Sequence, residues 1–289
     1  MALIDLLHTL LAGMLARLIV RQPGLGEKIV RRAREREDLD QFFVAGTQAM
    51  LERYPKPKSL TFLQPQLIRV LQDIDPAMTH LQSCWSQEGE DLIVSRLVDR
   101  QISGKYVDVG AHDPYRFSNT YLLYRSGWRG INIDANPASV QRMREARPAD
   151  VCIEAFVGTE GEQHQFIEYD EPALSTSSSE LVACRETRGV PYKVVGSRLV
   201  VARSLAGILS EHLKGNSFDL LNIDVEGGER GVMESNDWQR FRPRIIIIEV
   251  PAKDVVDLLE HQLSAFLIER RYELFAKLYN SAIFVSAEG

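Results

Sequence analysis

The stretch Tyr106-Val-Asp-Val-Gly110 decides the fold class of this chain. It is a short apolar run that ends in an acidic residue and a glycine. Similar runs follow along the chain, and the clearest of them is Ile245–Ile248. Segments of helical periodicity separate these runs. Because the runs are apolar on both faces, they are typical of central strands in a parallel sheet that is covered by helices on both sides. The sequence therefore predicts an α/β domain.

The same pattern predicts where the elements of this domain lie. Strands are expected at 105–110, 130–134, 151–157, 218–224, 244–250, 272–275 and 282–285. Helices are expected at 118–126, 137–147, 203–214, 229–236 and 253–270. The last two strands form a hairpin, so we expect a seven-stranded, mostly parallel sheet within a domain at 81–289. Residues 1–80 are interpreted as an N-terminal helical extension.

Composition narrows the class of partner and the compartment. Lys and Arg number 34 against 40 Asp and Glu, which gives a net charge of −6. Proteins that bind nucleic acid usually present a basic face, so no nucleic-acid partner is expected. The three cysteines are far apart and include no Cys-x-x-Cys pair, which is typical of a reducing compartment. We therefore expect a cytoplasmic protein.

The first 20 residues are strongly apolar, but Asp5, His8 and Arg17 interrupt them. A membrane-spanning helix needs about 20 nearly uncharged residues, so a span is not expected. An amphipathic helix fits better. It could pack on the domain, pack on a second subunit in a homo-oligomer, or lie on the inner face of the membrane as a peripheral contact. We favour packing.

Each expected strand of the parallel sheet ends in a polar or acidic residue. These residues are Asp108 with Gly110, then Asp134, Glu154, Asp224 and Glu249. In open α/β sheets, ligands bind at the carboxyl ends of the strands. A carboxylate at the end of a buried strand is costly unless it is solvated or paired. The alignment of these acids therefore predicts a binding site at this edge.

The loop after the first strand indicates the class of ligand. It carries the single glycine Gly110 and lacks the Gly-x-Gly-x-x-Gly pattern that cradles a pyrophosphate. A phosphate-free, cationic ligand such as S-adenosylmethionine fits this loop. Asp134 would then accept hydrogen bonds from the ribose hydroxyls, followed by Ala135 and by Asn136 at the start of a helix. Glu154 and Ala155 would lie at the adenine edge.

Several blocks, in order, resemble the FkbM family of S-adenosylmethionine-dependent methyltransferases. They are Ser86-Gln-Glu-Gly-Glu-Asp91, Tyr106-Val-Asp-Val-Gly-Ala111, Ser118-Asn-Thr-Tyr121, Gly127-Trp-Arg-Gly-Ile-Asn-Ile-Asp-Ala-Asn-Pro137 and Leu221-Asn-Ile-Asp-Val-Glu-Gly-Gly-Glu229. The resemblance covers about Ser86 to Val285. It implies the class I (Rossmann-like) methyltransferase fold, with strand order 3-2-1-4-5-7-6.

The resemblance also assigns roles to residues. It implies that Asp108, Gly110, Asp134 and Glu154 bind the cofactor. Asn119 and Thr120 would offer donors to the methionine carboxylate at a helix start, or would simply cap that helix. Gln87 would fold over the cofactor or hold the helical leader.

Asp224 is the candidate that contacts the acceptor, with Glu226 two residues on and His112 as an alternative base. Asp224 and Glu249 could instead hold one Mg²⁺ between them. Related small-molecule O-methyltransferases carry acids at these two strand ends. Here Glu249 replaces the more usual Asp, and Val250-Pro251 follows it in place of an amide ligand.

A long segment at 168–197 is expected to be a polar lid, which suits a saccharide. With the resemblance, it predicts O-methylation of a sugar or glycosylated acceptor in polysaccharide, O-antigen or glycolipid assembly. Alternative acceptors are a secondary metabolite or nucleic acid, although the chain lacks an Asn-Pro-Pro-Tyr-like motif after the fourth strand. A non-catalytic assembly protein that retains the fold is the other alternative.

Overall fold

The computed structural model describes residues 84–98, 103–213, 215 and 217–288. The helical extension expected at 1–80 lies outside these residues. The membrane and oligomer contacts that this extension would make therefore stay predictions.

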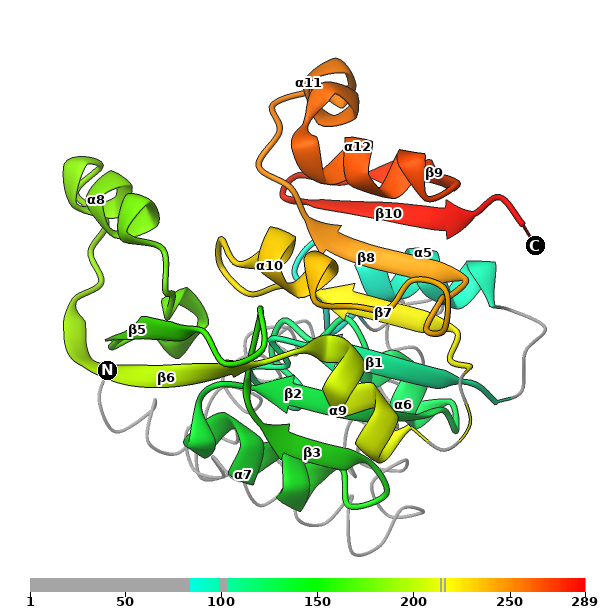
Figure 1. Ribbon diagram of the computed structural model, residues 1–289, viewed down its shortest axis with the longest axis horizontal. Coiled ribbons are helices and arrows are strands. Elements are labelled where there is room, and N and C mark those ends of the chain that lie inside the picture. The colour runs from blue at the N-terminus through cyan, green and yellow to red at the C-terminus, as the bar shows by residue number, and fades with distance from the viewer. Residues whose placement is uncertain (1–83, 99–102, 214, 216, 289) are drawn as a thin grey trace, which may run out of the picture. The chain divides into compact units, whose positions relative to one another are not determined.

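Seven strands form the main sheet (Figure 1). They are β1 (Lys105–Val109), β2 (Arg129–Asp134), β3 (Val151–Glu154), β7 (Leu220–Ile223), β8 (Ile245–Glu249), β9 (Tyr272–Lys277) and β10 (Ser281–Ser286). Their order is β3-β2-β1-β7-β8-β10-β9, with parallel pairing from β3 to β8. β10 runs antiparallel to both of its neighbours. The mostly parallel seven-stranded sheet and the order 3-2-1-4-5-7-6 are thus confirmed.

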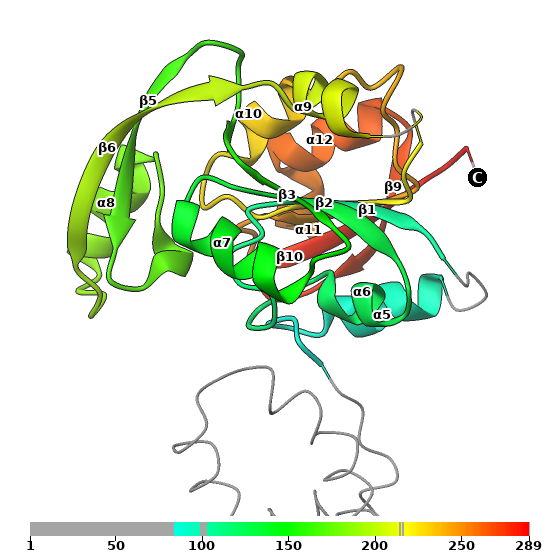
Figure 2. The ribbon, with the colours of Figure 1, turned by 90° about the horizontal axis from the view of Figure 1, so that it is seen from below.

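Helices cover both faces of this sheet (Figure 2). One face carries α5 (Glu90–Leu97), α6 (Tyr121–Arg125) and α7 (Pro137–Ala146). The other carries α9 (Leu205–His212), α10 (Glu229–Glu234) and α12 (Gln262–Glu269). Strand β8 explains why both layers are needed. Ile245 and Ile247 pack in the cluster that includes Val94 of α5, whereas Ile246 and Ile248 pack in the opposite cluster.

The helix predictions are right in kind, but all five are longer than the helices observed, and two of them differ most. The helix expected from residue 118 begins at Tyr121. The helix expected at 253–270 is two helices, α11 (Val255–Glu260) and α12. His261 separates them because its backbone is extended and its Nδ1 accepts a hydrogen bond from the amide of Leu263, at 3.3 Å. No helix in the described part of the chain is long and apolar enough to cross a membrane.

A second, three-stranded sheet is inserted between β3 and α9. It consists of β4 (Phe156–Val157), β5 (Gln163–Tyr169) and β6 (Val194–Arg203), in the order β4-β6-β5. The 3₁₀ helix η2 (Pro172–Leu174) and α8 (Ser179–Thr187) connect β5 to β6. The expected strand at 151–157 is therefore wrong beyond Glu154, because Phe156 and Val157 pair with β6 instead. Likewise, the segment expected as a polar lid loop is largely regular structure.

Candidate active site

A cavity lies where β1, β2 and β7 end, which is the edge that the acidic strand ends predicted. Eleven of the fourteen predicted site residues line it: Gln87, Asp108, Gly110, His112, Asn119, Asp134, Ala135, Asn136, Ala155, Asp224 and Glu226. The other three, Thr120, Glu154 and Glu249, are not among its lining residues. Four carboxylates line the cavity, and its described lining includes no lysine or arginine.

Gly110 allows the loop after β1 to pass close to the end of β7. Its φ is +83°, and a Cβ at this position would lie 1.7 Å from the carbonyl oxygen of Asp224. The amide of Gly110 donates to the carbonyl of Ile133 at 2.9 Å. Glycine is needed here because the backbone conformation and the close approach both exclude a side chain. Gly110 therefore lets Asp224 lie close to the loop that follows β1.

Asp108 is fixed from two sides and is only 2% exposed. Its carboxylate accepts from the hydroxyl of Thr120 at 2.5 Å and from the side-chain amide of Asn222 at 2.9 Å. Burial raises the pKa of Asp108. The Thr120 hydroxyl is therefore engaged with Asp108 and does not face the cavity. Asn119 does line the cavity, and its amide donates to Asn222 at 2.9 Å.

Asp134 is the carboxylate at the end of β2. Its two oxygens accept from the backbone amides of His112 and Asn136, each at 2.7 Å. Burial nevertheless raises the pKa of Asp134 to about 6. Each oxygen keeps acceptor capacity for a ligand in the cavity. Asn136 caps α7 by accepting from the amide of Ala138, so the helix starts where the sequence predicted.

The apolar wall of the cavity begins just after β3. Ala155, Phe156, Val157 and Phe166 line it. Glu154 was expected at this wall, but it is exposed and lies outside the lining. The chain turns after Glu154 to enter β4, which directs Ala155 and Phe156 to the cavity.

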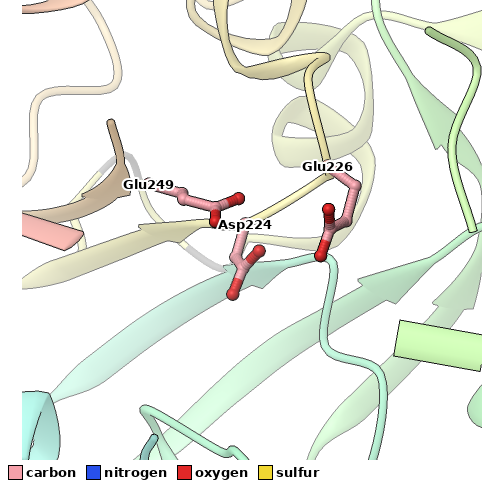
Figure 3. A group of neighbouring side chains, drawn as sticks. All are labelled: Asp224, Glu226 and Glu249. Carbon is pink, nitrogen blue, oxygen red and sulfur yellow. The ribbon is translucent and has the colours of Figure 1, made fainter. Parts of the chain in front are cut away.

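Three carboxylates meet beside the cavity, at the ends of β7 and β8 (Figure 3). They belong to Asp224, Glu226 and Glu249, and their nearest ligand atoms all lie within 4.8 Å of one another. Desolvation and mutual repulsion raise the pKa of Asp224 well above its ordinary value. The same two causes raise the pKa of Glu249 to about 9. Carboxylate oxygens are the kind of ligand that Mg²⁺ takes in proteins.

Glu226 is already engaged by the inserted sheet. Arg185 of α8 forms an ion pair with its carboxylate, and the hydroxyl of Thr176 donates to its carbonyl at 2.6 Å. Arg185 therefore neutralises Glu226, although burial still raises the pKa of that carboxylate. Asp224 and Glu249 have no side-chain partner among the described residues, so they are the better placed pair for a metal or a proton.

His112 also lines the cavity, as a predicted alternative base. Its φ of +46° is unusual for a non-glycine residue. Its Nε2 is buried and has no hydrogen-bond partner among the described residues. Burial lowers the pKa of His112, so its ring is neutral near pH 7.

Two more arginines tie the inserted sheet to the loops around the cavity. Arg116 forms a bidentate ion pair with Glu171, with both N–O distances at 2.9 Å. Arg198 of β6 donates to the carbonyl of Ala135. Through these contacts, η2 and the end of β5 form the outer wall of the cavity.

Arg147 positions residues of the site and was missed in the sequence analysis. Its guanidinium is fully buried and donates to the hydroxyls of Thr120 (2.8 Å) and Ser118 (2.7 Å) and to the carbonyl of Pro114 (2.7 Å). It thus holds the loop that follows β1, and it holds Thr120, the partner of Asp108. A signal was present, because Arg147 continues the buried face of α7 at helical spacing from Val140 and Met143.

Comparison with known proteins decides the family. A model of the FkbM methyltransferase domain matches residues 108–273, which is more than half of the chain. The chain belongs to the FkbM methyltransferase family. It is thus an S-adenosylmethionine-dependent methyltransferase. No curated protein matches its sequence.

Solved structures with similar folds share little sequence with this FkbM methyltransferase. A TehB-like methyltransferase from Corynebacterium glutamicum is 11% identical, over 77% of this chain and 99% of that one, with a TM-score of 0.37. An O-methyltransferase from Bacillus cereus, in complex with SAH, is 14% identical, over 83% and 96%, with a TM-score of 0.36. A putative O-methyltransferase from Klebsiella pneumoniae is 14% identical, over 72% and 83%, with a TM-score of 0.34.

The cavity of this FkbM domain fits the cofactor of the family. S-adenosylmethionine carries a sulfonium cation, and the described residues of the lining supply carboxylates without a competing lysine or arginine. Asp134 offers acceptors for hydroxyl donors, and Phe156 belongs to an apolar wall that suits a purine.

Proposed function

We propose that the protein methylates a hydroxyl of a sugar or glycosylated acceptor, in the assembly of a polysaccharide, O-antigen or glycolipid. The observation that carries the proposal is the pair Asp224 and Glu249, two carboxylates of raised pKa beside the cofactor cavity that have no side-chain partner in the described part of the chain. A hydroxyl must lose a proton as its oxygen is methylated, and an ionised carboxylate whose pKa is raised is a stronger base than an ordinary carboxylate.

The residues of the chain then have distinct tasks. Asp134 and the wall at Phe156 hold the cofactor. The loop at Gly110 sets the distance between the cofactor and Asp224. When bound, S-adenosylmethionine supplies the methyl group, so that a carbon–sulfur bond breaks as the oxygen–carbon bond forms and S-adenosylhomocysteine is left. Asp224 in its ionised form accepts the hydroxyl proton, while Glu249 keeps the proton that its raised pKa retains.

Mg²⁺ is a second way in which this pair could serve the same reaction. Asp224 and Glu249 would hold the ion, with Arg185 neutralising Glu226 beside it. The ion would supply Lewis-acid polarisation of the acceptor hydroxyl.

A saccharide is favoured by the chemistry of the cavity wall. A sugar hydroxyl can both donate and accept a hydrogen bond, so an acceptor rich in hydroxyls complements carboxyl groups in either protonation state. The cavity is also lined by Ser175, which follows η2, and by the exposed ring of Phe117.

The test is transfer of labelled methyl from S-adenosylmethionine to nucleotide sugars and extracted glycans. We expect label in an ether that survives alkali, and at least about a hundredfold lower rate with Asp224→Asn. Label in a base-labile ester, on nitrogen or in nucleic acid would contradict the proposal. Assays with and without EDTA separate the base from the metal role.

A further inference from the structure

A second cavity lies apart from the cofactor cavity and has no role in the function proposed above. Its volume is about 780 Å³. It is lined by Arg188, Pro251, Ala252, Lys253, Lys277, Leu278, Tyr279 and Asn280. These residues come from the end of α8, the segment after β8 and the turn between β9 and β10.

The two cavities have opposite charge. The cofactor cavity is lined by four carboxylates and by no described lysine or arginine. The second cavity is lined by three cations, Arg188, Lys253 and Lys277, and none of its described lining residues is acidic. Such a concentration of cations is unexpected in a chain of net charge −6. An anionic ligand is the complement of this lining.

Two of the three cations are available to a ligand. The side chains of Arg188 and Lys253 have no hydrogen-bond or ion-pair partner among the described residues, and both are exposed. The third is fixed, because Lys277 Nζ donates to the carbonyls of Leu278 and Tyr279, the latter at 2.7 Å. Its charge is therefore held at the turn.

Two carboxylates near this cavity accept hydrogen bonds from backbone amides. Glu88 accepts from the amide of Asn280, with both oxygens at 2.9 Å, and Asp257 accepts from the amide of Lys253 at 3.0 Å. Neither carboxylate lines the cavity or pairs with one of its three cations. The ring of Tyr279, 85% exposed, stands at the rim and offers an aromatic surface.

The second cavity adjoins the acidic cluster. Pro251 follows Glu249 by two positions on the segment that leaves β8. Arg188 lies three positions after Arg185, which pairs with Glu226. Figure 1 shows α8 and the segment between β8 and α11 on the side of the sheet where β7 and β8 end. A single acceptor could therefore reach from the acidic cluster into the basic cavity.

We propose that this cavity binds the diphosphate of the acceptor, so that the enzyme methylates a sugar while it is attached to its diphosphate carrier. The inference rests on the proposed function. Arg188 would contact phosphate oxygens through its planar fork, while Lys253 and Lys277 supply point charges. The cations set which end of the acceptor enters the acidic site, because the carboxylates there repel the diphosphate.

A sugar diphosphate can come from two sources that share this chemistry, a nucleotide sugar and a lipid-linked sugar. Inorganic pyrophosphate carries the shared group alone and is the first probe. UDP-glucose, and phosphatidylcholine vesicles that contain farnesyl diphosphate, represent the two sources. Glucose is the neutral control.

The experiment is calorimetric titration of the full chain with these probes. The test variant is Arg188→Gln with Lys253→Gln. The charge-matched control is Arg96→Gln with Lys193→Gln, which removes two exposed cations that do not line the cavity. We expect the test variant to bind pyrophosphate about tenfold more weakly than the wild type, and the control to stay within about twofold. Added salt should weaken wild-type binding.

Equal pyrophosphate affinity in the test variant and the control would overturn the proposal, as would wild-type binding no stronger than that of glucose. Stronger binding of UDP-glucose than of the vesicles supports a soluble acceptor, and the reverse order supports a lipid-linked one. S-adenosylmethionine is titrated separately into all three proteins and should bind equally. Its failure to bind the wild type would sink the proposed function while leaving the pyrophosphate result intact.

Discussion

The substitution Glu249→Gln probes the acidic pair most sharply. In the folded protein the pKa of Glu249 is raised from 4.5 to about 9 by burial and by the charge of Asp224. Above pH 4.5, the ordinary pKa of a glutamate, the unfolded chain loses the proton of Glu249, whereas the folded state keeps it. Stability from this group is fully present below about pH 4.5 and is lost as the pH rises toward about 9.

The size of the effect follows from linkage. One retained proton costs about 1.4 kcal/mol of unfolding free energy per pH unit within that window. From about pH 5.5 to about pH 7.5 the loss is about 2–3 kcal/mol, or roughly 5–10 °C in melting temperature for a domain of this size. A glutamine carries no proton to retain, so Glu249→Gln should lack this decline.

The assay is thermal unfolding of the wild type, Glu249→Gln and the control Glu260→Gln across this pH range. Glu260 is exposed at the end of α11, so its substitution removes a carboxylate outside the cluster. We expect the difference between Glu249→Gln and the wild type to grow with pH, and the Glu260→Gln curve to run parallel to the wild type. Parallel curves for all three proteins would refute the raised pKa and, with it, the retained proton.

Three further changes test the site. Gly110→Ala should lower the free energy of unfolding by at least about 3 kcal/mol more than Gly161→Ala does, as measured by chemical denaturation. Both glycines have a φ of +83°, but only at Gly110 would a Cβ lie 1.7 Å from the carbonyl oxygen of Asp224. Equal losses of stability would contradict the close approach. Arg147→Met should lower the free energy of unfolding by about 3–5 kcal/mol and weaken cofactor binding. Unchanged stability in this variant would show that the buried guanidinium is dispensable. Affinity for S-adenosylmethionine should fall below about pH 6, where Asp134 becomes protonated, and a flat pH profile would remove its ribose role.

Much of the fold was predictable, because hydrophobic runs on central strands specify burial on both faces. The run Ile245–Ile248 feeds both core clusters, and the strand-end acids Asp134 and Asp224 meet at one cavity as expected. The inserted sheet was not predictable in the same way. Strand β6 has alternating exposed residues such as Val195 and Leu199, and its pairing partner lies far from it in sequence.

Where the structure places predicted site residues away from the cavity lining, the causes are local. Glu154 was expected in the site because it ends a strand, but the chain leaves the main sheet at that point and only the next residues face the cavity. Thr120 was expected to meet the cofactor, and its hydroxyl is instead bonded to Asp108. The pairing of Glu226 with Arg185 depends on how α8 packs, which no local pattern specifies.

The central claim is that the carboxylate-lined cavity binds S-adenosylmethionine, and calorimetric titration of the cofactor into the wild type and Asp134→Asn tests it most directly. Circular dichroism confirms that the variant is folded. We predict one site per chain in the wild type, and at least about tenfold weaker binding in the variant, because a ribose hydroxyl loses a charged acceptor. No binding to the wild type at about 1 mM cofactor, or equal affinity in the two proteins, would contradict this placement of the cofactor.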